Sequence, residues 1–336
     1  MQRYIDLTAP EKNELLIRTA ALMGISPTLL EKDFWVSWIL THIFQLPFSN
    51  HLVFKGGTSL SKCYGLIQRF SEDCDITIDK TLFSESIDDP LLSGKQFQRL
   101  LELADKQAID FIQQTFMTVL AKSITESLPT ESTWQLLPDE FEPKNIRFYY
   151  PVATSTHEHP YIKQSVLIEL GIRGDVYPCE EKNVISYVES KFLDLLDSEQ
   201  TPIRTLLPIR TFWEKITLVH AENNRPEGKA IGDRLSRHYY DIYQLIQAHI
   251  DDEALEHIDL LHDVIAHKKK YFRAAWANYD TAIPGQLIIY PHEKLLKELE
   301  KDYKNMNLMI FGSVPSFDEI LNSIQDFQTK MNSIMG

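Results

Sequence analysis

Apolar positions recur at helical spacing along the first part of the chain. The sequence Thr8-Ala-Pro-Glu11 has the form of a capping box and predicts a helix that continues to about residue 23. A Ser-Pro pair at residues 26 and 27 predicts the start of a second helix, which continues to about residue 45. Residues 34–50 lack charged side chains but include polar residues and a proline, whereas a membrane-spanning helix needs about 20 mostly apolar residues. We therefore predict a buried helix and no membrane partner.

The periodicity changes to that of β-strands between residues 51 and 79. Residues 51–54 are apolar and precede Lys55-Gly56-Gly57, which predicts a strand that leads into a glycine turn, with a helix over residues 58–68. Residues 71–79 alternate strictly between polar and apolar side chains, with Asp73, Asp75, Thr77 and Asp79 on one face and Cys74, Ile76 and Ile78 on the other. This alternation predicts a strand with one buried face.

The rest of the chain divides into a mixed region and a helical region. We predict a helix over residues 95–125, a polar loop over 127–144, and strands over 146–152 and 165–172. Later helices are predicted over residues 210–222, 234–248 and 254–278 and after a capping box at Ser316. The expected fold class is α/β (α+β), with a small mixed sheet flanked by helices in residues 1–204 and a mostly helical part in residues 205–336.

The composition is that of an ordinary globular protein, with 43% hydrophobic and 24% charged residues. The 34 Lys and Arg residues against 48 Asp and Glu residues give a formal net charge of −14. Because the chain as a whole repels polyanions, a nucleic acid would have to bind a local basic patch. The N-terminus lacks the apolar segment of a secretory signal, and the three cysteines form no CxxC pair. We therefore expect a cytoplasmic protein without a disulfide framework.

Two short motifs carry the candidate chemistry. Asp73 and Asp75 lie two residues apart on one predicted strand, so their carboxylates project from the same face and repel each other unless a divalent cation binds between them. Mg²⁺ prefers one or two carboxylates together with phosphate oxygens and water. Gly56-Gly57 ahead of a helix allows close backbone approach to phosphate, although the Walker A spacing is absent. Alone, each motif usually marks a solvated strand edge or a tight turn; in succession they indicate a nucleotide-transfer site.

The arrangement resembles the nucleotidyltransferase fold of the DNA polymerase β superfamily. Lys55-Gly-Gly-Thr-Ser-Leu-Ser-Lys62 followed by Arg69-Phe-Ser-Glu-Asp-Cys-Asp75 is similar to motifs of the abortive-infection (AbiEii/AbiGii) toxin nucleotidyltransferases. Further similar motifs are Glu31-Lys-Asp33-Phe-Trp, Glu214-Lys215 and Arg234-Leu-Ser-Arg237-His-Tyr-Tyr-Asp241. The resemblance implies an NTP-dependent nucleotidyltransferase that is the toxin of a type IV toxin–antitoxin pair, with a cognate antitoxin as partner.

The resemblance also implies roles for residues of the first region. Asp73 and Asp75 would hold Mg²⁺ on the nucleotide phosphates. Glu169 would be the third carboxylate, since it is an acid in an otherwise apolar strand pattern, where an unpaired charge is unfavourable. The alternative for Glu169 is a structural pair with Arg173 or a nearby lysine. The residues expected to cradle the phosphates are Gly56, Gly57, Thr58 and Ser59. Lys62, one helical turn after Ser59, would contact either phosphate or solvent.

Three residues of the helical region complete the predicted site. Lys215 would contact the nucleotide phosphates, and the alternative is a surface lysine whose stem lies on apolar side chains. Asp241 is assigned to the active site by the resemblance. Arg237 lies four residues earlier on the same helix face, where it can pair with Asp241, and it is included among the nucleotide-binding residues. His238 matches the motif but is not expected to act as a base.

Basic segments bear on the identity of the acceptor. Residues 204–237 contain seven Lys and Arg against four Asp and Glu, a local charge of 7 − 4 = +3. The segment His267-Lys-Lys-Lys-Tyr-Phe-Arg273 mixes cations with aromatic side chains, a composition suited to phosphate contact and base stacking. The alternative is a solvated helix face. Thr156-His-Glu-His159 lacks the spacing of a metal motif and is interpreted as a loop.

The sequence therefore predicts a Mg²⁺-dependent enzyme that transfers a nucleotidyl group from an NTP to an acceptor, with tRNA or another RNA favoured. One alternative keeps the fold but changes the acceptor to a small molecule or a protein hydroxyl, which the acidic composition favours. Another is a protein that binds nucleotide or RNA without turnover. The presence of Asp73, Asp75, Lys215 and Asp241 counts against this last alternative, because a pure binder has no need of a metal-holding acidic pair.

Overall fold

The computed structural model describes residues 1–84, 86–154, 163–196, 200–226, 228–229, 232 and 234–334. The segment Thr156–His159 lies outside these residues. The chain forms two compact units, the first of Met1–Cys63 with Ser71–Leu206 and the second of Tyr64–Phe70 with Leu207–Gly336. The division predicted at residue 204 did not include the short passage of Tyr64–Phe70 through the second unit.

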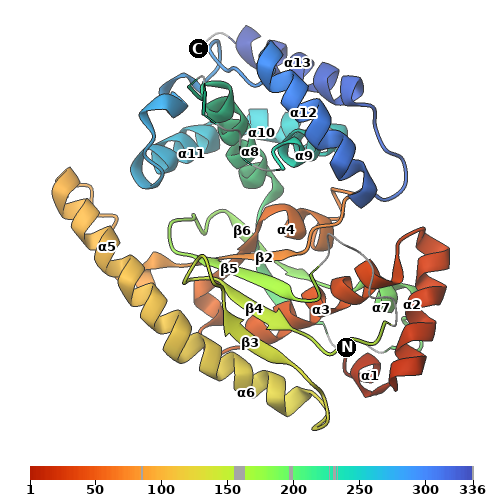
Figure 1. Ribbon diagram of the computed structural model, residues 1–336. Coiled ribbons are helices and arrows are strands. Elements are labelled where there is room, and N and C mark those ends of the chain that lie inside the picture. The colour runs from red at the N-terminus through yellow and green to blue at the C-terminus, as the bar shows by residue number, and fades with distance from the viewer. Residues whose placement is uncertain are drawn as a thin grey trace. The chain divides into compact units, whose positions relative to one another are not determined.

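The strands of the described residues form one mixed sheet in the first unit (Figure 1). Their bounds are β1 Leu52–Lys55, β2 Asp73–Ile78, β3 Gln135–Pro138, β4 Ile146–Tyr149, β5 Val166–Gly171, β6 Cys179–Asn183 and β7 Pro202–Leu206. The order across the sheet is β3-β4-β5-β2-β1-β7-β6. β2 lies in the middle, antiparallel to β1 and parallel to β5. The predicted fold class, a mixed α/β protein, is confirmed.

The two faces of the sheet differ in character. Cys74 of β2 lies opposite Ile168 of β5, and both side chains are fully buried. Since directly opposed residues point to the same face, they mark an apolar face. α3 (Pro27–Ile43) covers this face, where its Trp38 stacks on Phe148 of β4 with ring centroids 5.7 Å apart. The two aspartates of the predicted site therefore lie on the other face of the sheet.

Helices flank the sheet in the first unit. Besides α3 they are α1 Gln2–Asp6, α2 Ala9–Met23, α4 Gly56–Lys62, α5 Gly94–Phe111, α6 Met117–Ser127 and α7 Tyr187–Lys191. α2 begins at the predicted capping box, in which Glu11 accepts a hydrogen bond from the backbone N–H of Thr8. α5 and α6 are joined by a π-helical turn, Ile112–Phe116, and Figure 1 shows them as one long helical run.

Charged residues near the start of α3 are buried and join distant segments. Glu31 accepts hydrogen bonds from the backbone N–H groups of Ala153 and Thr154, at 2.5 and 3.2 Å. Lys32 pairs with Glu72, just before β2, at 2.5 Å. Because buried charges are stable only when paired or hydrogen-bonded, these contacts fix α3 against the strand that carries the aspartates.

The second unit is helical in its described residues. Its helices are α8 Pro208–Asn223, α9 Ser236–Gln247, α10 Ile250–Glu256, α11 Ile258–Tyr271, α12 Glu293–Met306 and α13 Phe317–Ser333. α8 packs against α9, α10 and α11, and α9 packs against α12 and α13. Phe212 of α8 meets Phe327 of α13 edge-on, with ring centroids 5.2 Å apart. None of the described helices is long and apolar enough to cross a membrane.

The segment Tyr64–Phe70 is held in this helical unit by backbone hydrogen bonds. The N–H of Phe70 donates to the carbonyl oxygen of Met309, and the N–H of Phe311 donates to that of Gln68, both at 2.7 Å. The chain thus leaves the first unit after α4, pairs briefly with residues 309–311, and returns immediately before β2.

Several predicted elements were wrong or incomplete. The helix expected over residues 58–68 ends at Lys62, and the chain then turns through Gly65, whose φ of +64° lies in the left-handed region. The loop expected over 127–144 contains β3, and the helix expected over 254–278 is divided into α10 and α11 at His257. No sequence pattern described above predicted β6, β7, α1, α7 or α12.

Candidate active site

Charged side chains from three neighbouring strands form a row on the polar face of the sheet. Asp75 of β2 lies opposite Lys55 of β1 and opposite Glu169 of β5. Neighbouring strands are about 4.8 Å apart and opposed residues share a face, so these three side chains lie side by side. Asp73 lies two residues earlier on the same face of β2. The structure therefore places the three predicted carboxylates on one surface. It adds Lys55, to which the sequence analysis gave no role.

Gly56 approaches Asp75 so closely that a side chain would not fit. Its φ is +81°, and a Cβ atom at this position would lie 2.2 Å from Oδ2 of Asp75. The glycine is needed for its backbone conformation and for the space that it leaves to the carboxylate. Gly57 follows as the second residue of α4 and is buried. The glycine turn and the acidic strand, predicted separately, are thus in direct contact.

The donor set on β2 fits a divalent cation. Burial raises the pKa of the Cys74 thiol well above its usual value, and the negative charges of Asp73 and Asp75 on either side raise it further. Among the described residues, no group of three or more His, Cys, Asp and Glu forms a ready-made metal cluster. Two carboxylates would leave the other coordination positions to phosphate oxygens and water, an arrangement that suits Mg²⁺.

The two hydroxyl groups expected to bind phosphate are used inside the protein. Thr58 donates a hydrogen bond from Oγ1 to the carbonyl oxygen of Asp73 at 2.6 Å, and Ser59 donates from Oγ to the carbonyl oxygen of Gly56 at 2.9 Å. Both side chains are fully buried. The Thr58 hydrogen bond joins α4 to the start of β2, whereas that of Ser59 lies within α4, and this geometry does not favour either hydroxyl as a phosphate ligand.

Lys62 has a structural partner in place of the phosphate or solvent expected for it. Its ammonium group pairs with the carboxylate of Asp33 on α3 and lies 4.0 Å from the centre of the Tyr187 ring. Asp33 also accepts a hydrogen bond from the backbone N–H of Tyr187 at 2.7 Å. Burial raises the pKa of Asp33, and the charge of Lys62 opposes that rise. Lys62 therefore fastens α4 to α3.

A second cluster of charged residues lies within the helical unit. Arg69 donates two hydrogen bonds to the carboxylate of Asp241 on α9, from Nε to Oδ1 at 2.7 Å and from Nη2 to Oδ2 at 2.8 Å. Lys215 of α8 donates to Oδ2 of the same carboxylate at 2.8 Å. All three side chains are buried. Asp241 therefore pairs with Arg69 and Lys215, and the pair that we expected between Asp241 and Arg237 does not form. The motif contained Arg69, but nothing in it indicated a partner on α9.

The electrostatics of this cluster favour its charged state. Burial alone would raise the pKa of Asp241, but the adjacent Arg69 and Lys215 outweigh it and hold this pKa well below its usual range. Burial lowers the pKa of Lys215, and the charge of Asp241 opposes that effect. Lys215 is thus neither the surface lysine considered above nor free of protein partners. The nearby charge of Arg237 also lowers the pKa of Lys215.

His238 lies beside this cluster and faces the same positive charges. Its Nδ1 is buried and has no hydrogen-bond partner among the described residues. Burial lowers the pKa of His238 well below its usual value, and the charges of Lys215 and Arg237 lower it further. The imidazole is therefore neutral at neutral pH.

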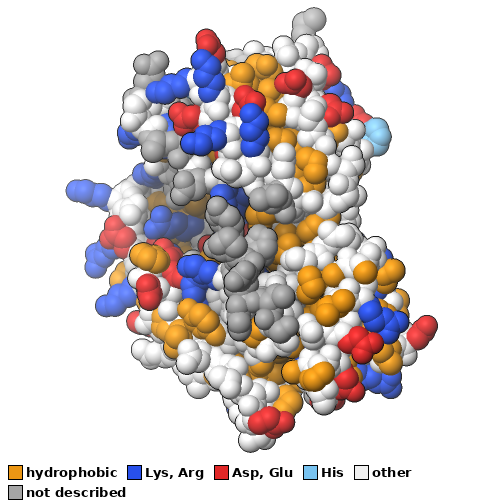
Figure 2. Space-filling model, turned by 45° about the vertical axis from the view of Figure 1, so that its right-hand side comes forward, with side chains coloured by type: hydrophobic (Ala, Val, Ile, Leu, Met, Phe, Trp, Pro, Cys, Tyr) orange, Lys and Arg blue, Asp and Glu red, His pale blue; other side chains and the backbone are white. Residues whose placement is uncertain are grey.

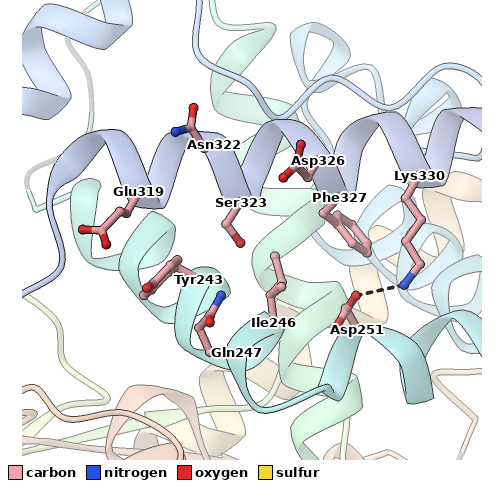
Figure 3. A pocket seen from close by; sticks show the side chains of 10 residues that line it. All are labelled: Tyr243, Ile246, Gln247, Asp251, Glu319, Asn322, Ser323, Asp326, Phe327 and Lys330. Atoms are coloured by element: carbon pink, nitrogen blue, oxygen red, sulfur yellow. Dashed lines mark hydrogen bonds and ion pairs between the residues drawn. The ribbon is translucent and has the colours of Figure 1, made fainter.

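Two pockets open within the helical unit. The first, of about 460 Å³, lies between α9, α10 and α13 (Figure 3). Its carboxylates are those of Asp251, Glu319 and Asp326, and its one cation, Lys330, pairs with Asp251 at 3.2 Å. This excess of negative charge disfavours the binding of a phosphate group in the first pocket. The second pocket, of about 500 Å³, lies along the C-terminal half of α11 and is lined by basic residues.

A mixed sheet whose central strand presents two aspartates beside a glycine-started helix is the arrangement of a nucleotidyltransferase. The family described as "Nucleotidyl transferase AbiEii toxin, Type IV TA system" matches residues 38–323, and the chain belongs to this family of toxin–antitoxin nucleotidyltransferases. The resemblance found in the sequence is confirmed. No curated protein matches the chain.

A solved structure supports the fold. The chain is similar to MenT4, a nucleotidyltransferase toxin from Mycobacterium tuberculosis, with a TM-score of 0.54 and 14% sequence identity. The similarity covers 98% of this chain and 91% of MenT4. At this identity the comparison supports the shared fold over nearly the full length of both chains.

Proposed function

We propose that the protein transfers a nucleotidyl group from an NTP to an RNA acceptor, with tRNA as the leading candidate, in a Mg²⁺-dependent reaction. Modification of tRNA would block translation, which accounts for the growth arrest expected of a toxin. The observation that carries the proposal is the position of Asp75, which lies in register between Lys55 and Glu169 and directly against Gly56.

The residues of the first unit have distinct roles in this proposal. Asp73 and Asp75 hold Mg²⁺, which when bound neutralises phosphate charge as a Lewis acid. Glu169 lies in the same row of side chains and accepts the proton of the attacking hydroxyl. The backbone N–H groups of Gly56 and Gly57 bind phosphate oxygens, because the nearby hydroxyls are already hydrogen-bonded within the protein.

In the helical unit, Lys215 contacts nucleotide phosphate, as the family resemblance implies, and Arg237 is a further nucleotide-binding residue. Arg69 and Asp241 hold Lys215 in place through the buried hydrogen bonds described above. Family membership also implies an NTP as substrate and a cognate antitoxin as partner. We propose that the antitoxin acts on transcription and forms no tight complex with this chain, and that the protein works in the cytoplasm, where NTPs and tRNA are found.

The test offers the purified protein each α-labelled NTP in turn, with Mg²⁺ and total bacterial tRNA. The Asp73→Ala/Asp75→Ala variant is the matched control. Label transferred to RNA by the wild type, and by the variant at a rate at least about a hundredfold lower, is the expected result. Omission of Mg²⁺ with added EDTA should abolish the transfer equally.

Other outcomes would redirect or contradict the proposal. Label on a protein, or on a small molecule, would show that the acceptor is not RNA. Equal transfer by wild type and variant would exclude the acidic pair as the metal site. No transfer to any acceptor, together with equal growth arrest by wild type and Asp75→Asn, would favour toxicity through binding alone.

A further inference from the structure

The second pocket of the helical unit gathers basic residues that the proposed catalytic site does not use. It has a volume of about 500 Å³ and lies along the last two turns of α11. Its charged lining residues are Lys269, Lys270, Arg273 and Asp280. The His267–Arg273 run, noted in the sequence for its composition, therefore borders a hollow and is not simply a solvated helix face.

The charge of this pocket is opposite to that of the whole chain. Three permanent cations against one carboxylate leave an excess of 3 − 1 = +2, although Lys269 pairs with Asp280, in a chain whose net charge is −14. On the face drawn in Figure 2, Lys and Arg side chains lie among Asp and Glu side chains and are not collected into one broad surface. Because polyanions bind where cations gather locally, such a pocket is the kind of site that a phosphate backbone needs.

The helix dipole explains only part of this arrangement. Cations in the last turn of a helix are stabilised by its partial negative charge, which accounts for Lys269 and Lys270. Arg273 lies beyond the end of α11, yet it lines the same pocket and is exposed. The dipole therefore does not account for the place of Arg273 among the residues that line the pocket, because the dipole effect is confined to the last turn.

Aromatic side chains of the same run lie beside its cations, next in sequence to the residues that line the pocket. His267 stacks on Tyr271 with ring centroids 4.7 Å apart, and Lys268 lies 5.4 Å from the centre of the Phe272 ring. Phe272 is 42% exposed, so its ring is partly accessible to solvent. An exposed ring next to clustered cations offers both stacking and charge, the two contributions by which proteins bind unpaired nucleotides.

We propose that the pocket along the C-terminal half of α11 binds the phosphate backbone of the acceptor RNA, with Phe272 available to stack on a base. The inference rests on the proposed function and extends it, since it assigns a docking surface for the acceptor to residues that have no role in binding the NTP. The ligand chemistry is that of RNA: repeated phosphates together with exposed base faces.

The test measures binding of total tRNA to the full chain without NTP, across salt concentrations from about 50 to 200 mM. The pocket variant is Lys269→Glu/Arg273→Glu. The matched control is Lys297→Glu/Lys304→Glu on α12, which changes the net charge equally at two exposed lysines with helical acidic partners. We expect the pocket variant to bind tRNA at least about tenfold more weakly, with a salt dependence lower by about one to two counter-ions. The control should stay within about twofold of the wild type.

The other possible results of the binding and transfer assays also test the proposed RNA-binding surface. Equal weakening of both variants, an unchanged pocket variant, or a wild type that binds no tRNA would overturn the proposal. Should the charge reversal lower the thermal midpoint, the milder Lys269→Gln/Arg273→Gln variant takes its place with the same expectation in direction. Pocket-dependent binding without label transfer would contradict the proposed reaction and leave this surface standing, whereas normal transfer and binding by the pocket variants would contradict this surface alone.

Discussion

Gly56 and Gly65 provide a matched pair of residues for testing the contact between the glycine turn and the acidic strand. Both have left-handed backbone conformations, with φ of +81° and +64°. A Cβ at Gly56 would collide with Asp75, whereas one at Gly65 would meet nothing within 4 Å. We expect each alanine substitution to lower the free energy of unfolding by about 1–2 kcal/mol through backbone strain. Gly56→Ala alone should also reduce nucleotidyl transfer, by at least about tenfold.

The measurement for this pair combines urea unfolding with the labelled-transfer assay. Only a loss of activity beyond that of Gly65→Ala supports a role for Gly56 at the site, since the strain is common to both. Transfer that is reduced equally by the two substitutions would show that Gly56 matters for folding and not for the position of Asp75.

Substitution of Asp241 tests whether this buried carboxylate stabilises the folded protein or takes part in the nucleotidyl transfer. Its carboxylate balances the charges of Arg69 and Lys215 in a dry environment. Asp241→Asn should lower the free energy of unfolding by roughly 3–5 kcal/mol, because it leaves two buried cations without their partner. Adding Lys215→Met should restore part of this loss. Chemical denaturation of the single and double variants checks both expectations, and an inactive Asp241→Asn of full stability would instead assign the carboxylate to the reaction.

The pH dependence of this carboxylate follows from its lowered pKa. A group whose pKa is lower in the folded state than in the unfolded state stabilises the protein above its unfolded value of about 3.9, and this contribution is lost as the pH falls further. The contribution of Asp241 to the free energy of unfolding is therefore complete at neutral pH and is lost only under strongly acid conditions.

The sequence was sufficient to identify several residues of the candidate site, but not the residues with which their side chains form ion pairs. Asp73, Asp75 and the two glycines were recognisable because their spacing is local and sets which face they share. Lys62 and Asp241 were given the wrong partners, because their true partners, Asp33 and Arg69, are remote in sequence and on other elements. A pattern of residues within one element predicts a face, whereas an ion pair between elements depends on how the chain folds back.

At the level of elements, α3 and α6 are joined by a buried histidine. Nδ1 of His42 lies 2.8 Å from Oγ of Ser123, and burial lowers the pKa of His42 to about 4. The unfolded chain binds a proton near its ordinary pKa of about 6.5, so stability falls as the pH drops from 6.5 towards 4. Between pH 7 and pH 5 we expect His42 to account for a loss of about 2 kcal/mol.

His42→Asn keeps a polar side chain opposite Ser123 but removes the titrating group. The measurement is the change in the free energy of urea unfolding between pH 7 and pH 5, compared between wild type and variant. Contributions of all other groups cancel in this difference. An identical change with pH in the two proteins would show that His42 is not the source.

Helices and strands were predicted correctly where a few neighbouring residues carry a strong sequence signal. Capping boxes located the starts of α2 and α13 to the residue, since each cap is satisfied by side chains three positions apart. β3 was hidden in a polar segment, because only one of its side chains is even half-buried. α12 had a readable pattern, with Leu295, Leu299 and Tyr303 buried at four-residue intervals, and was overlooked.

At the scale of the whole molecule, the chain passes between its two units at three points rather than one. Tyr64–Phe70 contributes Ile67 and Phe70, each 3% exposed, to the helical unit before the chain returns to β2. A single cut after Leu206 therefore leaves this segment without its partners. We expect the fragment 1–206 to be insoluble or destabilised alone, because it exposes these apolar side chains and the buried Arg69. Co-expression with the fragment 207–336 should restore solubility, and the two should purify together.

A variant of the fragment separates this cause from a general weakness of the first unit. Replacing residues 64–70 by a Gly-Ser loop removes the orphaned segment and should make the fragment 1–206 soluble, as judged by size-exclusion chromatography and thermal unfolding. A native fragment that is already soluble and as stable as its loop variant would contradict the expectation. It would also favour the simple division at residue 204, with Tyr64–Phe70 as a connection that can be detached. Insolubility relieved by the loop or by the second fragment would instead show that the unpartnered segment Tyr64–Phe70, and not a weakness of β2 or of the rest of the first unit, makes the fragment insoluble.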